Sequence, residues 1–278
     1  MLAALLIVFR EVLEAGLIIG IVLAATAGTP GRLRFIGYGA AGGLAGAGLL
    51  ALFARQLAGA FAGAGQDVFN AVVLGTAVLM LAWHTVWMAR HARALSQEMG
   101  ALGRSVAVGE RAMTALAVVI GVAILREGAE VVLFLFGIVV SGGEAPAAVL
   151  LGGVGGIVVG GLLSWLIYRG LLIIPTRRLF GVTNLLLSLL AAGMAGQAAV
   201  YLVRAGLVSP FGDQLWDTSA WLPDNGLIGR SLHVLVGYSD RPMGIQLAVY
   251  AAVLVTLLVL QRTLAPPTAG SVVVSTAR

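Results

Sequence analysis

Apolar runs of about 20 residues, separated by short polar or glycine-rich connections, set the pattern of the chain. An α-helix needs about 20 apolar residues to cross the hydrocarbon core of a bilayer, whereas the strands of a membrane β-barrel alternate over about 10 residues. The pattern therefore predicts an all-α integral membrane protein with seven transmembrane helices. We place these helices at 2–26, 35–57, 67–89, 113–140, 148–170, 180–204 and 243–261.

The seven helices make one transmembrane domain over residues 1–262, which a loose tail at 263–278 follows. Most connections are short and contain glycine or proline. The exceptions are the segment 90–112 between the third and fourth helices and the outer loop 205–242 before the seventh.

The first six helices contain an internal repeat. A shift of 116 residues superposes the first helix on the fourth, and a shift of 113 residues lays Gly42-Gly43 on Gly155-Gly156. A unit of three helices is odd in number, so the second unit must be inverted in the membrane, as in many transporters. The predicted repeats are A, at about 2–89, and B, at about 113–204, with the seventh helix outside them.

Composition agrees with a membrane protein. Sixty per cent of the residues are hydrophobic and 10% are charged, against about 25% charged residues in soluble domains. The sequence pI near 10.4 does not indicate nucleic-acid binding, because the arginines lie in short loops between apolar runs. The absence of cysteine excludes disulfides, thiolate metal sites and iron–sulfur clusters.

The loop arginines predict the orientation of the chain. Eleven lie on the side that holds the C-terminal tail, and four lie on the opposite side. Cytoplasmic loops carry the excess of basic residues, so we expect a cytoplasmic C-terminus, an N-terminus outside, and residence in the cytoplasmic membrane. The four on the outer side are Arg55, Arg204, Arg230 and Arg241.

Two copies of an R-E-x-x-E pattern interrupt the first and fourth apolar runs. A charge at the bilayer centre costs roughly 2.5–3.5 kcal/mol even on translocon-based scales, so six such charges in a duplicated pattern indicate a functional site. The chain has twelve acidic residues, and these motifs hold four of them. The copies comprise Arg10, Glu11 and Glu14, and Arg126, Glu127 and Glu130.

The spacing of each motif places both glutamates on one helix face, with the arginine one turn from the second glutamate. An inverted repeat would bring the two faces together around one space. Carboxylates bind hard cations such as Fe³⁺, Mn²⁺, Mg²⁺ or Ca²⁺, and the arginines reduce the repulsion among them. Two other interpretations stay open: each motif braces its helix as an Arg–Glu pair, or the arginines bind an anion beside an acidic proton relay.

Three acids near the outer side are candidates for an approach path for cations. Asp67 opens the third helix, where it could equally cap the helix end. Asp217 and Asp240 lie in the outer loop beside tryptophans typical of the membrane interface.

The histidines and methionines carry a weaker signal. His84 and His91 lie toward the inner end of the third helix, and His233 lies in the outer loop. Without ligand spacing, we expect all three to be structural. The seven methionines are scattered, which does not support a methionine path for copper.

With both motifs in place, the chain resembles the oxidase-dependent iron transporters, that is, the fungal high-affinity iron permeases and the bacterial ferrous iron permeases. The resemblance covers almost the whole chain. It also includes Trp87-Met88, Trp216-Asp217-Thr218-Ser219 in the outer loop, and Gly237-Tyr238 with Arg241-Pro242 before the seventh helix.

The resemblance implies iron uptake across the cytoplasmic membrane, coupled to oxidation of Fe²⁺ by a separate protein. In fungi this partner is a multicopper oxidase, and in bacteria it is an extracytoplasmic iron-binding protein with a haem peroxidase. Iron is then a substrate, with no permanently bound cofactor. By this resemblance Glu11, Glu14, Glu127 and Glu130 are the iron ligands, which Arg10 and Arg126 support.

The chain departs from the family pattern at two points. Val12 stands where the first motif has glycine, and Ala220 ends a segment that closes with an acid in the fungal members. The second departure argues against a fungal type of oxidase contact. A transporter of manganese or lead on the same scaffold, and a membrane ferroxidase, are the remaining alternatives.

Overall fold

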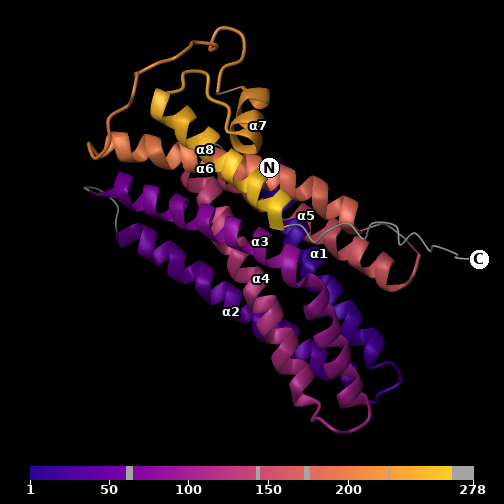
Figure 1. The fold of residues 1–278 in the computed structure, drawn as a ribbon. Coiled ribbons are helices and arrows are strands. Elements are labelled where there is room, and N and C mark those ends of the chain that lie inside the picture. The colour runs from indigo at the N-terminus through magenta and orange to yellow at the C-terminus, as the bar shows by residue number, and fades with distance from the viewer. Residues whose placement is uncertain (61–64, 142–144, 172–175, 225, 265–278) are drawn as a thin grey trace, which may run out of the picture.

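The computed structural model describes residues 1–60, 65–141, 145–171, 176–224 and 226–264, and every regular element in these ranges is an α-helix. The helices form an elongated bundle in which α3 runs through most of the length, while α7 and α8 lie at one end (Figure 1). In chain order they are α1 (Leu2–Ala25), α2 (Arg32–Ala60), α3 (Gln66–Ala107), α4 (Thr114–Val140), α5 (Pro146–Tyr168), α6 (Thr176–Arg204), α7 (Leu227–Val236) and α8 (Gly244–Leu264).

Six of the predicted helices agree with the structure to within four residues at each end. The exception is α3, which we expected to end at residue 89 but which continues to Ala107. The charges after residue 89 end the apolar run, yet the segment contains no proline, so the helix continues. Its partly buried Leu95 and Met99 and its buried Val106 pack between α1 and α4.

The loop 205–242 contains a helix that the apolar pattern did not predict. Helix α7 has only 10 residues, too few to cross a bilayer. It ends at Gly237, whose φ of 72° is favourable for glycine. This glycine packs directly against the backbone of Gly193 in α6, which fixes α7 against the bundle.

The helices pack in pairs that are far apart in the sequence. Helix α1 packs mainly on α5, α2 on α4, and α3 on α6, while α1 and α4 also meet. The glycines of α2 and α5 permit the first two contacts, because small residues let helix backbones approach closely. A Cβ on Gly43 would lie 2.7 Å from the carbonyl oxygen of Gly121, and one on Gly156 would lie 2.7 Å from that of Leu5.

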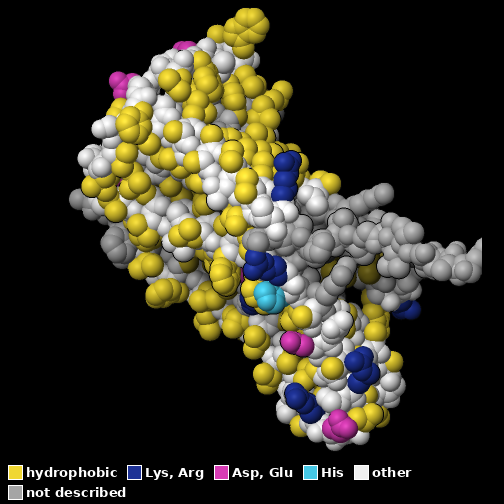
Figure 2. All heavy atoms as spheres, in the orientation of Figure 1, with side chains coloured by type: hydrophobic (Ala, Val, Ile, Leu, Met, Phe, Trp, Pro, Cys, Tyr) yellow, Lys and Arg dark blue, Asp and Glu magenta, His cyan; other side chains and the backbone are white. Residues whose placement is uncertain are grey.

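The surface of the bundle is largely apolar. Figure 2 shows hydrophobic side chains over most of the visible face, with several charged side chains gathered at the lower end, near the junction of α3 and α4. Helices α2, α3, α5, α6 and α8 each contain a span long and apolar enough to cross a membrane. Large side chains such as Leu79, Trp83 and Leu150 are about 70% exposed, which suits a lipid environment.

Two buried apolar clusters occupy the interior. One contains Ile7 of α1 and Phe134 of α4, and the other contains Val22 of α1 and Ile120 of α4. The residues of both R-E-x-x-E motifs lie between these clusters along their helices. Their charged groups therefore occupy a polar layer in the middle of the bundle.

Candidate metal centre

The acidic faces of α1 and α4 meet in this polar layer, and α3 adds a histidine. Glu11, His84, Glu127 and Glu130 each offer a donor atom, and these atoms all lie within 4.8 Å of one another. The four side chains are at most 4% exposed. The structure thus brings acids from both motifs around one space, as the repeated pattern predicted.

Glu14 lies beside this group and is held by two cationic or polar partners. Its Oε1 is 2.9 Å from Nε of Arg10, and its Oε2 is 3.2 Å from Nε2 of His84. Arg10 also approaches Oε1 of Glu11 at 3.4 Å, and only 2% of its side chain is exposed. The first motif therefore has its arginine fully inside the protein, between its own two acids.

The second motif places its arginine differently. Arg126 approaches Glu130 with 3.4 Å between Nε and Oε1, but 34% of its side chain is exposed. Its guanidinium lies 4.4 Å from the ring centroid of Trp87, a cation–π contact. Trp87 in turn stacks on His91. Arg126 is thus held between the acidic layer and an aromatic pair at the surface of α3.

His84 is the site residue that the sequence analysis missed. We expected a structural histidine, yet the structure places it between the two motifs, with Nε2 toward Glu14 and Nδ1 2.5 Å from Oε2 of Glu130. The one signal was its position inside an apolar run, because a histidine there must find polar partners. His91 and His233 have backbone carbonyl partners, at Trp87 and Tyr238, which agrees with structural roles.

Three carboxylate oxygens of this centre remain without a hydrogen-bond partner among the described residues. The Oε2 atoms of Glu11, Glu127 and Glu130 are buried and have no hydrogen-bond partner among the described residues, although that of Glu130 lies 2.5 Å from Nδ1 of His84. Buried polar atoms are almost always paired, so such atoms in a cluster of acids indicate a place for a missing cation or water. The Arg–Glu braces exist in both motifs, but they do not satisfy these oxygens.

The donor set has a clear chemical capacity. Carboxylates and an imidazole can bind a divalent transition metal ion, and the buried arginine limits the repulsion among the acids. The chain contains no cysteine, and carboxylates and an imidazole make a poor site for Cu⁺, which prefers sulfur ligands.

The three acids predicted to form an approach path lie apart from this centre. Asp67 sits in the first turn of α3, where a carboxylate interacts favourably with the helix dipole. Asp240 accepts the backbone N–H of Asp224 at 3.1 Å, and Asp224 accepts that of Asp240. These contacts brace the loop, and the approach path stays a prediction.

Asp217 of the loop 205–242 is held by several neighbouring groups. It accepts hydrogen bonds from the backbone and the hydroxyl of Ser219, and its Oδ2 is 3.1 Å from Nε of Arg241. Mainly through the Ser219 bonds, its pKa is lowered to about 2. Asp224 behaves in the opposite way, because partial burial beside Asp240 raises its pKa.

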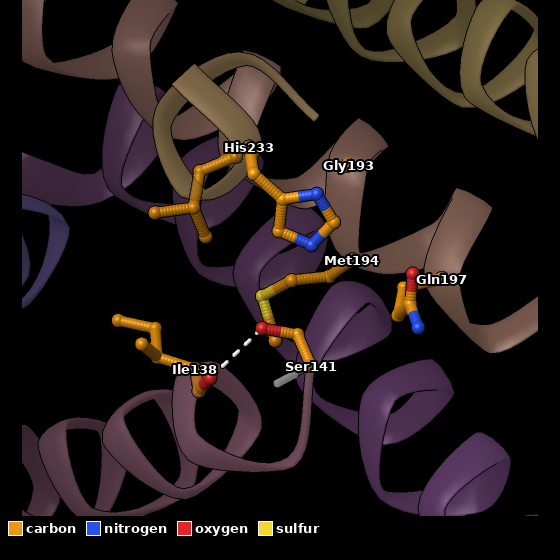
Figure 3. A pocket seen from close by; sticks show the side chains of 7 residues that line it. Ile138, Ser141, Gly193, Met194, Gln197 and His233 are labelled. Carbon is orange, nitrogen blue, oxygen red and sulfur yellow. Dashed lines mark hydrogen bonds between the residues drawn. The ribbon is translucent and has the colours of Figure 1, made fainter. Parts of the chain in front are cut away.

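A pocket of about 610 Å³ opens between α6, α8 and the outer loop, and a cavity of about 10 Å³ lies at its inner end. Figure 3 shows this inner cavity, where His233 and Met194 approach Ser141, which donates to the carbonyl of Ile138. The larger pocket is lined by three arginines and one acid, Asp224. The small cavity is lined by Ile138, Leu190 and Met194 of the first apolar cluster, and none of its lining residues belongs to the acidic layer.

Comparison with known proteins decides the class of the molecule. The Iron permease FTR1 family matches residues 1–265. The chain belongs to this family. It is 31% identical to the ferrous iron permease EfeU of Escherichia coli O157:H7, over 98% of both chains. It is 29% identical to the ferrous iron permease EfeU of Yersinia pestis, over 98% of this chain and 97% of that protein. No solved structure matches the chain.

Family membership and the helical bundle together define what the chain does at a coarse level. It is an integral membrane protein of the iron permease family, its class of function is iron transport, and it is a transporter and not an enzyme. The ferroxidase alternative is thereby removed.

Proposed function

We propose that the chain takes iron up across the cytoplasmic membrane through the acidic layer that the two R-E-x-x-E motifs form. One observation carries the proposal: acids from α1 and α4 surround one buried space in the middle of the bundle, with three carboxylate oxygens left without a hydrogen-bond partner. Bridging metal ions would offset the repulsion that these acids otherwise exert on one another.

In the proposed architecture α1 and α4 cross the membrane with the five apolar spans. At 24 and 27 residues they are about 36 and 40 Å long, enough for a hydrocarbon core of about 30 Å. Their three central charges lower their hydropathy. Those charges are buried in the protein, apart from the partly exposed Arg126, so the lipid faces of both helices remain apolar.

The inverted repeat is supported by the pairing of helices. Exchange of the two repeats converts the α1–α5 contact into the α4–α2 contact, and both are made by glycines at equivalent positions. Gly39 and Gly43 meet the carbonyls of Ala117 and Gly121, while Gly152 and Gly156 meet those of Met1 and Leu5. The shift of 113 residues relates the glycines of α2 to those of α5, and the shift of 116 residues relates their partners in α1 to those in α4. Binding at the repeat interface then permits alternating access by rocking of one repeat against the other.

The same symmetry accounts for Val12. In the first repeat a Cβ on Gly160 would lie 3.1 Å from Cβ of Val12, whereas in the second a Cβ on Gly128 would lie 2.6 Å from Cβ of Ala47. Each interface therefore pairs a glycine with a larger residue. The glycine lies in α5 in the first interface, opposite the motif, and in α4 in the second, within the motif. The departure from the family pattern at Val12 is compensated by Gly160.

The proposal includes an extracytoplasmic partner that oxidises or delivers iron, with the N-terminus outside and the C-terminus in the cytoplasm. The distribution of loop arginines supports this orientation. The outer loop supplies an ordered surface for such a partner, because Asp217, Ser219 and Arg241 are fixed to one another.

Radioactive iron uptake into cells tests the proposal. We expect Glu127→Gln/Glu130→Gln to reduce uptake by at least tenfold at equal abundance in the membrane. The matched control is Glu98→Gln/Glu110→Gln, which neutralises two exposed acids outside the acidic layer and should leave uptake unchanged. Full uptake by the first variant would show that the motifs only brace their helices. Excess unlabelled manganese and lead test the alternative substrates, because strong competition would assign another metal to the same site.

A further inference from the structure

We propose that His84 is a direct ligand of the transported ion and that Glu14 orients it, so the site consists of three carboxylates and one imidazole. This inference rests on the proposed function, because it assigns the ligands of the same site. It differs from a site made of the four motif glutamates by exchanging Glu14 for His84.

Glu14 differs from the other acids in the number of its carboxylate oxygens that already have a partner. Both of its oxygens are engaged, one by Arg10 at 2.9 Å and one by His84 at 3.2 Å. Glu11 and Glu127 each keep one buried oxygen without a hydrogen-bond partner among the described residues. An ion can therefore bind Glu11 and Glu127 without breaking a contact, whereas Glu14 would have to leave its partners.

The orientation of the imidazole suits a ligand. Metal-binding histidines commonly donate the second ring N–H to a carboxylate, which fixes the ring and the tautomer. In this structure the imidazole bridges Glu14 and Glu130, with Nδ1 2.5 Å from Oε2 of Glu130. When an ion enters, Nε2–H can keep its contact with Glu14 while Nδ1 leaves Glu130, loses its proton and presents its lone pair to the ion. Neighbouring ligands of a first-row ion lie about 3 Å apart, so this pair must separate by roughly half an ångström when an ion enters.

The spacing of the donors also fits one ion. Ligands on opposite sides of a first-row metal ion are about 4.0–4.4 Å apart, for bonds of about 2.0–2.2 Å. The four donor atoms already lie within 4.8 Å of one another. Small side-chain movements on α1, α3 and α4 therefore suffice to close the coordination sphere.

A difference between the two repeats explains why Glu14 of the first motif is not a ligand, whereas Glu130 of the second motif is. A shift of 114 residues relates His84 to Ala198 in α6, which has no ligand atom. Glu130, the counterpart of Glu14, has its exposed arginine at 3.4 Å and keeps Oε2 directed at His84. The second repeat thus supplies two acids as ligands, and the first supplies one acid and the histidine.

The imidazole narrows the class of ion. Oxygen-only sites suit Mg²⁺ and Ca²⁺, while an imidazole nitrogen favours first-row transition ions. A membrane site open to the outside must reject the abundant Mg²⁺ and Ca²⁺. We therefore assign His84 the role of selecting a divalent transition ion such as Fe²⁺ over these two.

Pulsed electron paramagnetic resonance of the purified full chain with Mn²⁺ as the probe tests the assignment. A directly bound imidazole nitrogen gives ¹⁴N modulation of the Mn²⁺ signal, which a histidine that only supports neighbouring residues does not. We expect this modulation in the wild type and in the control His91→Gln, and its loss in His84→Gln. Bound Mn²⁺ without ¹⁴N modulation in the wild type would overturn the proposal, and this result needs no variant to fold.

Two further variants separate positioning from ligation. Glu14→Gln should keep the ¹⁴N modulation and weaken Mn²⁺ binding by about 10–100-fold, the usual effect of removing the partner of a ligand. His84→Glu should raise the affinity for Ca²⁺ relative to Mn²⁺ by about tenfold, because the site then has oxygen donors only. Loss of the modulation in Glu14→Gln, or an unchanged preference in His84→Glu, would contradict these roles.

The outcome is distinguishable from failure of the proposed function. If uptake depends on Glu127 and Glu130 but Mn²⁺ shows no nitrogen ligand, the acidic site stands and only the role of His84 is wrong. If uptake is unaffected by loss of the two acids, the transport site itself is wrong, whatever ion the cluster binds.

Discussion

The two R-E-x-x-E motifs have the same spacing but different surroundings. In the first, Arg10 is sealed inside the bundle between Glu11 and Glu14. In the second, Arg126 is one-third exposed and rests on Trp87. The same local sequence therefore gives one internal ion pair and one that reaches the surface, because the neighbouring helix differs in each case.

This difference indicates that the two motifs have different roles in the site. In the first motif both oxygens of Glu14 are engaged, by Arg10 and His84, while Glu11 keeps one unpaired oxygen. The second leaves Glu127 with an unpaired oxygen and holds its arginine through an aromatic ring outside the acidic layer. The variants below test this contrast.

The largest effect is expected for Arg10→Met compared with Arg126→Met. Loss of one partner from a buried ion pair costs about 3–5 kcal/mol, whereas partly exposed pairs contribute roughly 0–1 kcal/mol. We expect Arg10→Met to lower the thermal stability and abundance of the purified protein strongly, and Arg126→Met to lower them slightly. Equal losses in melting experiments would show that the two arginines are equivalent.

A glycine exchange tests the packing side of the contrast. Gly128→Val should destabilise the α2–α4 contact by about 1–3 kcal/mol, because a Cβ there already lies 2.6 Å from Cβ of Ala47. The double variant Gly128→Val/Ala47→Gly reproduces the Val12–Gly160 arrangement and should recover most of the melting temperature. If the second change gives no recovery, the two interfaces are not equivalent.

A smaller effect is expected for Trp87→Leu. The leucine keeps an apolar side chain but removes the ring beneath Arg126, which is worth about 0.5–1 kcal/mol at a partly exposed site. We expect a slight loss of stability in wild type and no additional loss in the Arg126→Met background. Additive losses in this double-mutant cycle would show that Trp87 and Arg126 act independently.

The smallest effect is expected for Asp217→Asn in the outer loop, where the ion pair is exposed. The lowered pKa of Asp217 means that its contribution is present above the ordinary aspartate pKa and is lost as the pH falls through about 2. The variant should therefore match wild type in melting temperature at low pH and fall slightly below it near pH 7. A difference that persists at the lowest pH would assign the effect to packing and not to charge.

Most of the helical framework was predictable because apolar length is a local property. The runs that became α1, α2, α4, α5, α6 and α8 are bounded by glycine, proline and arginine, which mark helix ends and interfaces. The predicted span at 67–89 agrees with the apolar span Gln66–Met88, but the helix itself continues to Ala107, because hydropathy reports the boundary of an apolar environment and not that of the helix. The loop helix α7 was missed because it is too short to leave an apolar run of membrane length.

The candidate site was partly predictable for the same reason. The spacing of Glu11 and Glu14, and of Glu127 and Glu130, fixes each pair on one helix face, and the repeat indicates that the faces meet. His84 carries no such spacing, since its partners belong to α1 and α4.

The sequence by itself therefore determined the membrane class, the helix positions and the acids of the two motifs, because helix periodicity and hydropathy are read from neighbouring residues. Only the tertiary structure decided that His84 joins the acids, that Glu14 is engaged by its neighbours, and that Arg10 and Arg126 differ in exposure. These features depend on which helices pack together. Close backbone contacts set that arrangement between residues far apart in the chain, Gly43 with Gly121 and Gly156 with Leu5.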